Sequence, residues 1–107
     1  MKVAVVGAGA VGGWYGGHLA EQGHAVHLVT RADASTIAEH GLRLRDRGGE
    51  RVVRVASASA TTHGIGPCDL VIVAAKATAN PALPPLLRPL LGPMTILLTL
   101  QNGMGNV

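Results

Sequence analysis

The chain of 107 residues has few aromatic side chains, a single cysteine and little charge in its second half. It has no Phe, and Trp14 and Tyr15 are its only aromatics, so a hydrophobic core must be built from Val, Leu, Ile and Ala. Such a core is typical of buried parallel strands. Cys68 is the only cysteine, which excludes an internal disulfide and is consistent with a reducing compartment.

Charge is unevenly distributed along the chain. In the second half the only charged residues are Asp69, Lys76 and Arg88, and a surface so poor in charge indicates a neighbouring domain or subunit. Six of the nine basic residues lie between positions 31 and 54 and contribute to a net charge of +3. They alternate with acidic residues, and no aromatic side chains accompany them to stack on bases. Nucleic acid is therefore not expected as a partner.

Membrane, export and metal signals are also missing. The longest apolar stretch, Leu86–Leu100, is interrupted by Arg, Pro and Gly, so no membrane span is expected. The first residues run directly into an apolar strand pattern, which predicts no signal peptide and a cytoplasmic protein. The five histidines and the single cysteine form no zinc-ligand spacing, so no metal site is expected.

Short apolar runs alternate with helical patterns. Buried strands are expected at Val3–Val6, Ala25–Val29, Leu70–Ala74 and Thr95–Leu100. Helices are expected at Val11–Gln22 and at roughly Leu86–Leu91. A further short helix, capped by Asp33 or Ser35, is expected to end at His40. Leu42–Arg45 and Arg51–Val55 are expected to form a hairpin, and Ser57–Pro67 a loop. This alternation predicts an α/β fold with a Rossmann-like, doubly wound, mostly parallel sheet.

A glycine-rich turn follows the first strand. Gly7, Ala8, Gly9, Ala10, Val11 and Gly12 form a G-x-G-x-x-G motif that opens the first helix. The first glycine permits a tight turn, the second lets the backbone approach a pyrophosphate, and the third lets the helix pack close to the strand. The free N–H groups of the helix N-terminus then favour phosphate. We therefore expect residues 7–12 to bind a dinucleotide.

The end of the second strand indicates which dinucleotide. NAD-type sites place an acid about 20 residues after the glycine motif, where it binds the ribose hydroxyls. Here the sequence reads Val29-Thr30-Arg31, with no acid. A guanidinium suits a 2′-phosphate, so Arg31 predicts NADP(H), although many surface arginines contact nothing.

Two polar residues follow the last two strands. Lys76 can hold a cofactor ribose or a substrate carboxylate, it can transfer protons if its pKa is lowered, or it can simply reach solvent from the sheet edge. Asn102 can bridge a ribose hydroxyl and a substrate oxygen, or it can be an ordinary Asn-Gly turn residue. Because the carboxyl ends of parallel strands meet at one edge, both are expected near the glycine turn.

The order of these motifs resembles the N-terminal domain of ketopantoate reductases. The resemblance rests on residues 7–13, Arg31, the Asp69–Lys76 segment and Leu100–Asn106, and it spans nearly the whole chain. It implies an NADP(H)-binding Rossmann domain at residues 1–107 that continues beyond Val107, followed by a helical domain.

The resemblance also implies an activity: NADPH-dependent reduction of ketopantoate to pantoate in pantothenate biosynthesis. Residues 7–12, Arg31 and Lys76 would bind cofactor, and Asn102 would contact both cofactor and keto-acid substrate. No catalytic residue is assigned within the chain, because the family's proton donor lies beyond Val107. A homodimer is left open.

Two departures affect the substrate and not the cofactor: the small residues after Lys76 and the proline-interrupted helix that follows. Two alternatives therefore stay open, a non-catalytic dinucleotide-sensing module and another NADP-linked hydroxy-acid or opine dehydrogenase.

Overall fold

The computed structural model describes residues 1–7, 10–31, 33–74 and 81–100. Its elements in chain order are β1 (Lys2–Val6), α1 (Ala10–Glu21), β2 (Ala25–Val29), α2 (Ala34–His40), β3 (Leu42–Asp46), β4 (Gly49–Val53), β5 (Ser57–Ser59), β6 (Leu70–Ala74), α3 (Leu83–Leu87), a 3-10 turn (Arg88–Leu90) and β7 (Ile96–Leu100). The predicted alternation of strands and helices is confirmed.

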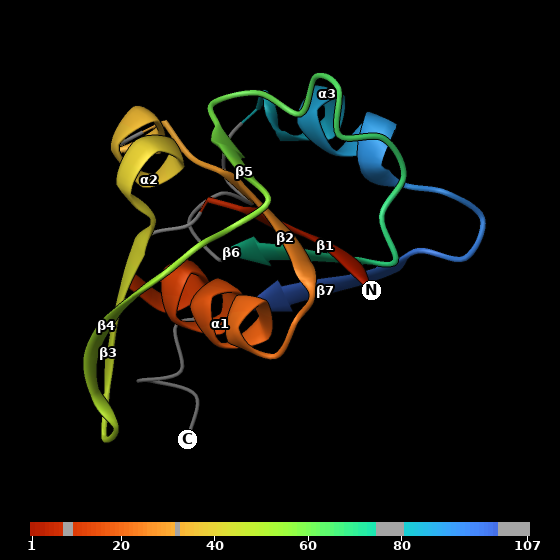
Figure 1. Cartoon of the computed structure of the whole chain (residues 1–107). Helices are drawn as coiled ribbons and strands as arrows, with labels where there is room; N and C mark the ends of the chain where they lie inside the picture. The colour runs from red at the N-terminus through yellow and green to blue at the C-terminus, as the bar shows by residue number, and fades with distance from the viewer. Residues whose placement is uncertain (8–9, 32, 75–80, 101–107) are drawn as a thin grey trace, which may run out of the picture.

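Five strands form one parallel sheet in the order β5-β2-β1-β6-β7, and β3 and β4 form a separate antiparallel hairpin. The chain moves outward from β1 in one direction through β2 and in the other through β6, as in a doubly wound sheet. Figure 1 shows α1 on one side of the sheet, α3 on the other, and the hairpin beside α1. The predicted Rossmann-like fold is therefore confirmed.

The core forms two layers because successive strand residues face opposite sides of the sheet. On the α1 side, Val3 and Val5 are fully buried, and Leu19 and Ala20 of α1 pack against this layer. On the other side, Ala4 and Val6 join a cluster against which Leu83 and Leu87 of α3 pack.

The first helix ends at a glycine with positive φ. Gly23 has φ 95°, its N–H donates to the carbonyl of Ala20 at 3.1 Å, and the N–H of His24 donates to Leu19 at 3.2 Å. These two bonds form a Schellman motif, which satisfies carbonyls that the helix end would leave unpaired.

Three expectations about the elements were wrong. Ser57–Ser59 is a strand, because its backbone pairs with β2 although its small side chains give no hydrophobic signal. The helix α3 begins earlier than expected, because Pro84 and Pro85 lie in its first turn, where the missing N–H groups cost nothing. Asp33 is at the N-cap of α2 but makes no side-chain cap hydrogen bond, and it has φ 61°.

The last strand is present but not buried. Ile96 is 66% exposed, Leu97 50% and Leu98 45%, although the sequence predicts a buried strand here. β7 is the outermost strand on its side of the sheet and pairs only with β6 among the described elements. Its apolar residues therefore face solvent in this part of the chain.

Candidate functional site

The strand register brings the predicted site segments to one edge of the sheet. Val6, the last residue of β1, pairs with Val29 of β2 on one side and with Val73 of β6 on the other. The next residue, Gly7, has φ 79°, a conformation that glycine adopts without strain. Its N–H donates to the carbonyl of Val29 at 2.7 Å, so the glycine turn begins directly beside the end of β2.

The third glycine of the motif packs as the pyrophosphate motif requires. A Cβ at Gly12 would lie 3.1 Å from the carbonyl oxygen of Gly7 and 3.3 Å from Val5 Cγ1, both closer than ordinary contacts. Glycine therefore allows the start of α1 to approach the end of β1. No acidic residue lies in the first turn of α1, so this turn supplies no carboxylate to offset the partial positive charge of the helix end.

The end of β2 carries the predicted phosphate-binding residue. Arg31 is exposed, two residues beyond Val29, and its guanidinium forms no ion pair with any residue that the structure describes. The Thr30 N–H donates to the carbonyl of Ser59 at 2.9 Å, so β5 holds the backbone of this segment. The positive charge thus lies one strand from the glycine turn.

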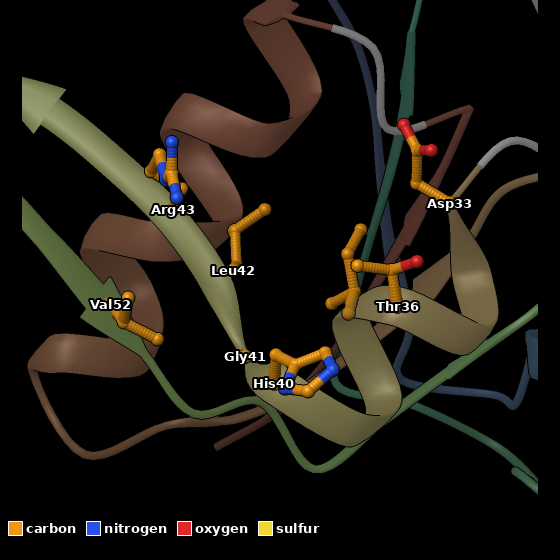
Figure 2. Close-up of a pocket in the computed structure, with 8 residues that line it drawn as sticks. Asp33, Thr36, His40, Gly41, Leu42, Arg43 and Val52 are labelled. Carbon is orange, nitrogen blue, oxygen red and sulfur yellow. The ribbon is translucent and has the colours of Figure 1, made fainter.

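A carboxylate also lies near this end of β2. Asp33 is exposed, and it lines a pocket of about 320 Å³ together with residues of α2 and the hairpin. Figure 2 shows this pocket between α2 and β3, with Asp33 and Arg43 on opposite walls. The sequence predicts only a capping role for Asp33 and gives no sign of this pocket, which forms where the hairpin folds back beside α2, the helix that directly precedes it.

Lys76 and Asn102 lie outside the described residues, as do Ala8 and Gly9 of the glycine motif. The strands that precede the two polar residues are described, and Ala74 pairs with Leu100. Lys76 and Asn102 each follow one of these paired residues by two positions, so the chain enters both segments at the same edge.

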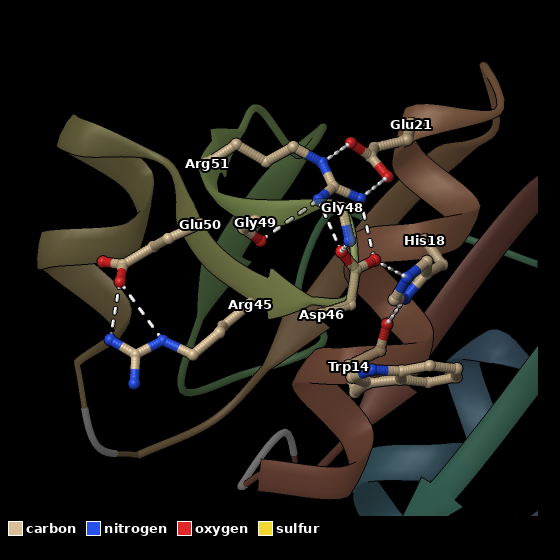
Figure 3. A network of polar contacts seen from close by, with 9 residues as sticks. All are labelled: Trp14, His18, Glu21, Arg45, Asp46, Gly48, Gly49, Glu50 and Arg51. Atoms are coloured by element: carbon tan, nitrogen blue, oxygen red, sulfur yellow. Dashed lines mark hydrogen bonds and ion pairs between the residues drawn. The ribbon is translucent and has the colours of Figure 1, made fainter.

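A polar network that the sequence did not indicate joins α1 to the hairpin (Figure 3). Arg51 of β4 donates to both oxygens of Asp46, at 2.8 and 3.0 Å, and to both oxygens of Glu21, at 2.7 Å for Oε1. These hydrogen bonds lower the pKa of Asp46 and of Glu21. His18 completes the network by contacting Asp46 at 2.7 Å.

The described residues contain no group of three or more His, Cys, Asp or Glu side chains that could hold a metal ion. None of the described helices combines the length and the apolar character that crossing a membrane requires.

A parallel, doubly wound sheet with a glycine at its carboxyl edge and a helix N-terminus beyond it is the architecture of the Rossmann type, which binds dinucleotides in many enzymes. The sequence model of the family "Ketopantoate reductase PanE/ApbA" matches residues 3–107. The chain belongs to this family, as the order of its motifs predicted.

Individual relatives agree with this assignment. The chain is 36% identical over 104 residues to a 2-dehydropantoate 2-reductase of Nostoc, covering 97% of this chain and 33% of the relative. A solved 2-dehydropantoate 2-reductase from Geobacter metallireducens superimposes with a TM-score of 0.83 at 38% identity, over 99% of this chain and 35% of that one. The chain thus spans about a third of the length of the curated relatives it matches.

One structural neighbour has a different name. A D-mandelate dehydrogenase in a ternary structure with NADH and anilino(oxo)acetate superimposes with a TM-score of 0.81 at 29% identity. The match covers 99% of this chain and 35% of that protein. The same fold is therefore found in an enzyme whose structure contains the other nicotinamide cofactor.

Proposed function

We propose that this chain is the cofactor-binding part of an NADPH-dependent reductase of a small α-keto acid, with ketopantoate as the substrate and pantoate as the product. The observation that carries the proposal is the contact between the glycine turn and the end of β2, where Gly7 donates to Val29 and Arg31 follows two residues later. Family membership and the 2-dehydropantoate 2-reductase relatives support the reaction. Such a reaction belongs to pantothenate biosynthesis.

The proposed cofactor site uses two features of the described edge. Residues 7–12 hold the pyrophosphate, because the turn exposes backbone N–H groups at the start of α1. Arg31 binds the 2′-phosphate, for which a guanidinium offers two parallel N–H donors. The tight approach of Gly12 to Gly7 fits this role, because a side chain at Gly12 would displace the turn.

The remaining roles are proposed for residues outside the described part. Lys76 contacts the cofactor, and Asn102 contacts both the cofactor and the substrate, where its amide orients the keto carbonyl. When bound, the reduced nicotinamide supplies the hydride that the keto carbon accepts. The proton donor belongs to the part of the polypeptide that follows these residues in longer relatives, where we also place a helical substrate domain.

The cofactor assignment is tested by comparing NADPH and NADH binding in two variants of the full-length protein. Arg31→Ala removes the contact to the extra phosphate, so NADPH binding weakens by about 1.5–3 kcal/mol, or more than about tenfold, while NADH binding changes little. Gly12→Ala is the matched control, because it disturbs the pyrophosphate turn shared by both cofactors and weakens both. Equal losses in Arg31→Ala would refute the NADP(H) assignment.

The substrate assignment is tested separately, by following NADPH oxidation by the full-length protein with ketopantoate. Turnover that falls in Asn102→Ala by a larger factor than NADPH binding weakens supports the proposed substrate role. Tight NADPH binding without turnover of any keto acid would instead favour the non-catalytic sensing module.

A second candidate function is the oxidation or reduction of another hydroxy acid–keto acid pair. It is favoured by the likeness to the D-mandelate dehydrogenase bound to NADH and by the exposed Asp33 near the end of β2. If NADH is the cofactor, Asp33→Asn weakens NADH binding and Arg31→Ala does not. Turnover of a panel of α-keto acids with both cofactors separates this candidate from the first.

A further inference from the structure

His18 lies between two hydrogen-bond acceptors on the face of α1 that meets the hairpin. Its Nδ1 is 2.7 Å from the carbonyl oxygen of Trp14, and its Nε2 is 2.7 Å from Asp46 Oδ2. A carbonyl oxygen and an ionised carboxylate can only accept hydrogen bonds, so both ring nitrogens must donate. Only the protonated imidazolium has two N–H groups, and the Trp14 ring, with its centroid 4.0 Å from that of His18, also favours the cation.

The charged groups around His18 are those of the network in Figure 3. Glu21 lies on α1 itself, Asp46 on β3, and Arg51 on β4 between the two carboxylates. Among the described residues, the sheet side of α1 meets an apolar cluster formed by Val3, Val5, Val26, Leu28 and Ile72, which brings no further charge. The proton on His18 is therefore held by one acceptor within α1, the Trp14 carbonyl, and by one acceptor from the hairpin, the Asp46 carboxylate.

A second contact between α1 and the hairpin does not depend on pH. A Cβ at Gly17 would lie 3.1 Å from Leu44 Cδ1 and 3.4 Å from Leu42 Cδ2, so the apolar side of the hairpin packs closely against the bare helix backbone. The hairpin thus has an apolar attachment near its base and an ionic one nearer its turn, where Gly48 donates to Asp46 Oδ1 at 2.8 Å.

We propose that the β3–β4 hairpin is a proton-dependent clamp on α1, closed when His18 is doubly protonated and loosened when His18 loses one proton. Loss of the proton leaves either the Trp14 carbonyl or the Asp46 carboxylate without its donor. The clamp acts on the helix whose first turn follows the glycine motif, but it does not depend on the proposed function, because its state is measured without cofactor.

The direction of the pH effect follows from the two partners. The hydrogen bonds to Trp14 and Asp46 raise the pKa of His18, and because Trp14 lies on α1 itself, only the bond to Asp46 is lost when the hairpin opens. The stabilisation is therefore complete below the ordinary histidine pKa of about 6.5 and is lost as the pH rises through the raised value. Each unit of difference between the pKa values of the closed and open states changes the opening equilibrium about tenfold.

The test is amide hydrogen exchange of β3 and β4 in the full-length protein between about pH 6 and 9, corrected for the intrinsic pH dependence of exchange, beside NMR titration of the His18 ring. We expect the protection of the β3 and β4 amides against exchange to fall as His18 loses its proton. The size of the fall is set by the difference between the His18 pKa values of the closed and open states. His18→Gln keeps one donor, lowers the protection and makes it independent of pH in this range. The exposed His63 gives a matched control, and His63→Gln leaves the pH profile unchanged.

Two further variants keep the proposal falsifiable. Asp46→Asn lowers the pKa of His18 and reduces the pH dependence, whereas Gly17→Ala loosens the hairpin equally at every pH because it disturbs only the apolar attachment. A His18 ring that titrates at or below its ordinary pKa, or a pH profile that survives in His18→Gln, would overturn the proposal.

Discussion

The sheet has two halves, β5-β2-β1 and β6-β7, and apolar strands in the two halves have very different surroundings. On one flank, β1 and β2 are covered by α1, and α1 is covered in turn by a hairpin joined to it through Arg51. On the other flank, β7 is as apolar as β1, yet Ile96 is 66% exposed whereas Val3 and Val5 are fully buried. An apolar strand pattern thus predicts a strand, and the neighbours decide whether that strand is buried.

The comparison supports a covering segment on the β7 flank. Three consecutive large apolar side chains of β7 face solvent, and this half of the chain has few charges to make such a surface soluble. The relatives are about three times as long as the matched chain. We therefore expect a further part of the polypeptide to pack on β7 in the full-length protein.

The largest expected effect is a loss of stability, and it tests whether β7 is buried in the full-length protein as β2 is here. In the full-length protein, Leu28→Ala lowers the free energy of unfolding by about 2–5 kcal/mol, because it leaves a cavity beside α1. If β7 is covered, Leu98→Ala has a loss in the same range, measured by urea denaturation.

The control for this comparison is Val52 on the outer face of the hairpin, which is 58% exposed. Val52→Ala is expected to change the free energy of unfolding by no more than about 0.5 kcal/mol. A loss for Leu98→Ala as small as this would show that β7 stays exposed.

A smaller effect is expected at the junction between α2 and the hairpin. Gly41 has φ 92° and ψ 171°, a region that essentially only glycine occupies, and a Cβ there would lie 2.6 Å from Val52 Cγ1. Gly41→Ala should therefore lower the free energy of unfolding by about 1–3 kcal/mol. Gly23→Ala is the comparison variant, because Gly23 also has positive φ but no neighbouring atom within 4 Å. If both variants lose the same amount, the contact with Val52 contributes nothing.

The smallest expected effect concerns the ion pairs between Asp46 and its neighbours, which attach the hairpin to α1. Hydrogen bonds from Arg51 and His18 lower the pKa of Asp46, so its stabilising contribution is present above the ordinary carboxyl pKa and is lost as the pH falls through and below it. Thermal unfolding from about pH 5 downwards should therefore show a steeper loss of stability for the natural protein than for Asp46→Asn. Parallel curves would mean that the ion pairs with Asp46 add nothing to stability.

Much of the fold could be predicted, because periodicity and glycine positions report local structure. The tight turn predicted at Gly7 has positive φ, and the core strands have continuous apolar runs. β5 could not be predicted, because it is held by backbone pairing to β2 and has the small residues Ser57–Ser59. The exposure of β7 could not be predicted either, because a sequence pattern does not reveal which strand lies at the edge of a sheet.

The candidate site was predictable only where one motif carries its own geometry. Residues 7–12 run from the end of β1 into the first turn of α1, so their spacing alone predicts a pyrophosphate-binding segment, which stays a prediction. The link between Arg51 and Glu21 joins residues thirty positions apart, and the pocket beside Asp33 needs both α2 and the hairpin in place. Such arrangements depend on tertiary packing, which spacing along a single chain does not encode.

The hydrogen bond from Gly7 to Val29 has a mechanical consequence. It extends the hydrogen bonding between β1 and β2 by one residue, to the first glycine of the motif. A shift of β2 relative to β1 would therefore also move Gly7. The two sites proposed for the pyrophosphate and the 2′-phosphate, at the glycine motif and at Arg31, are thus held at a fixed spacing by the same pair of strands.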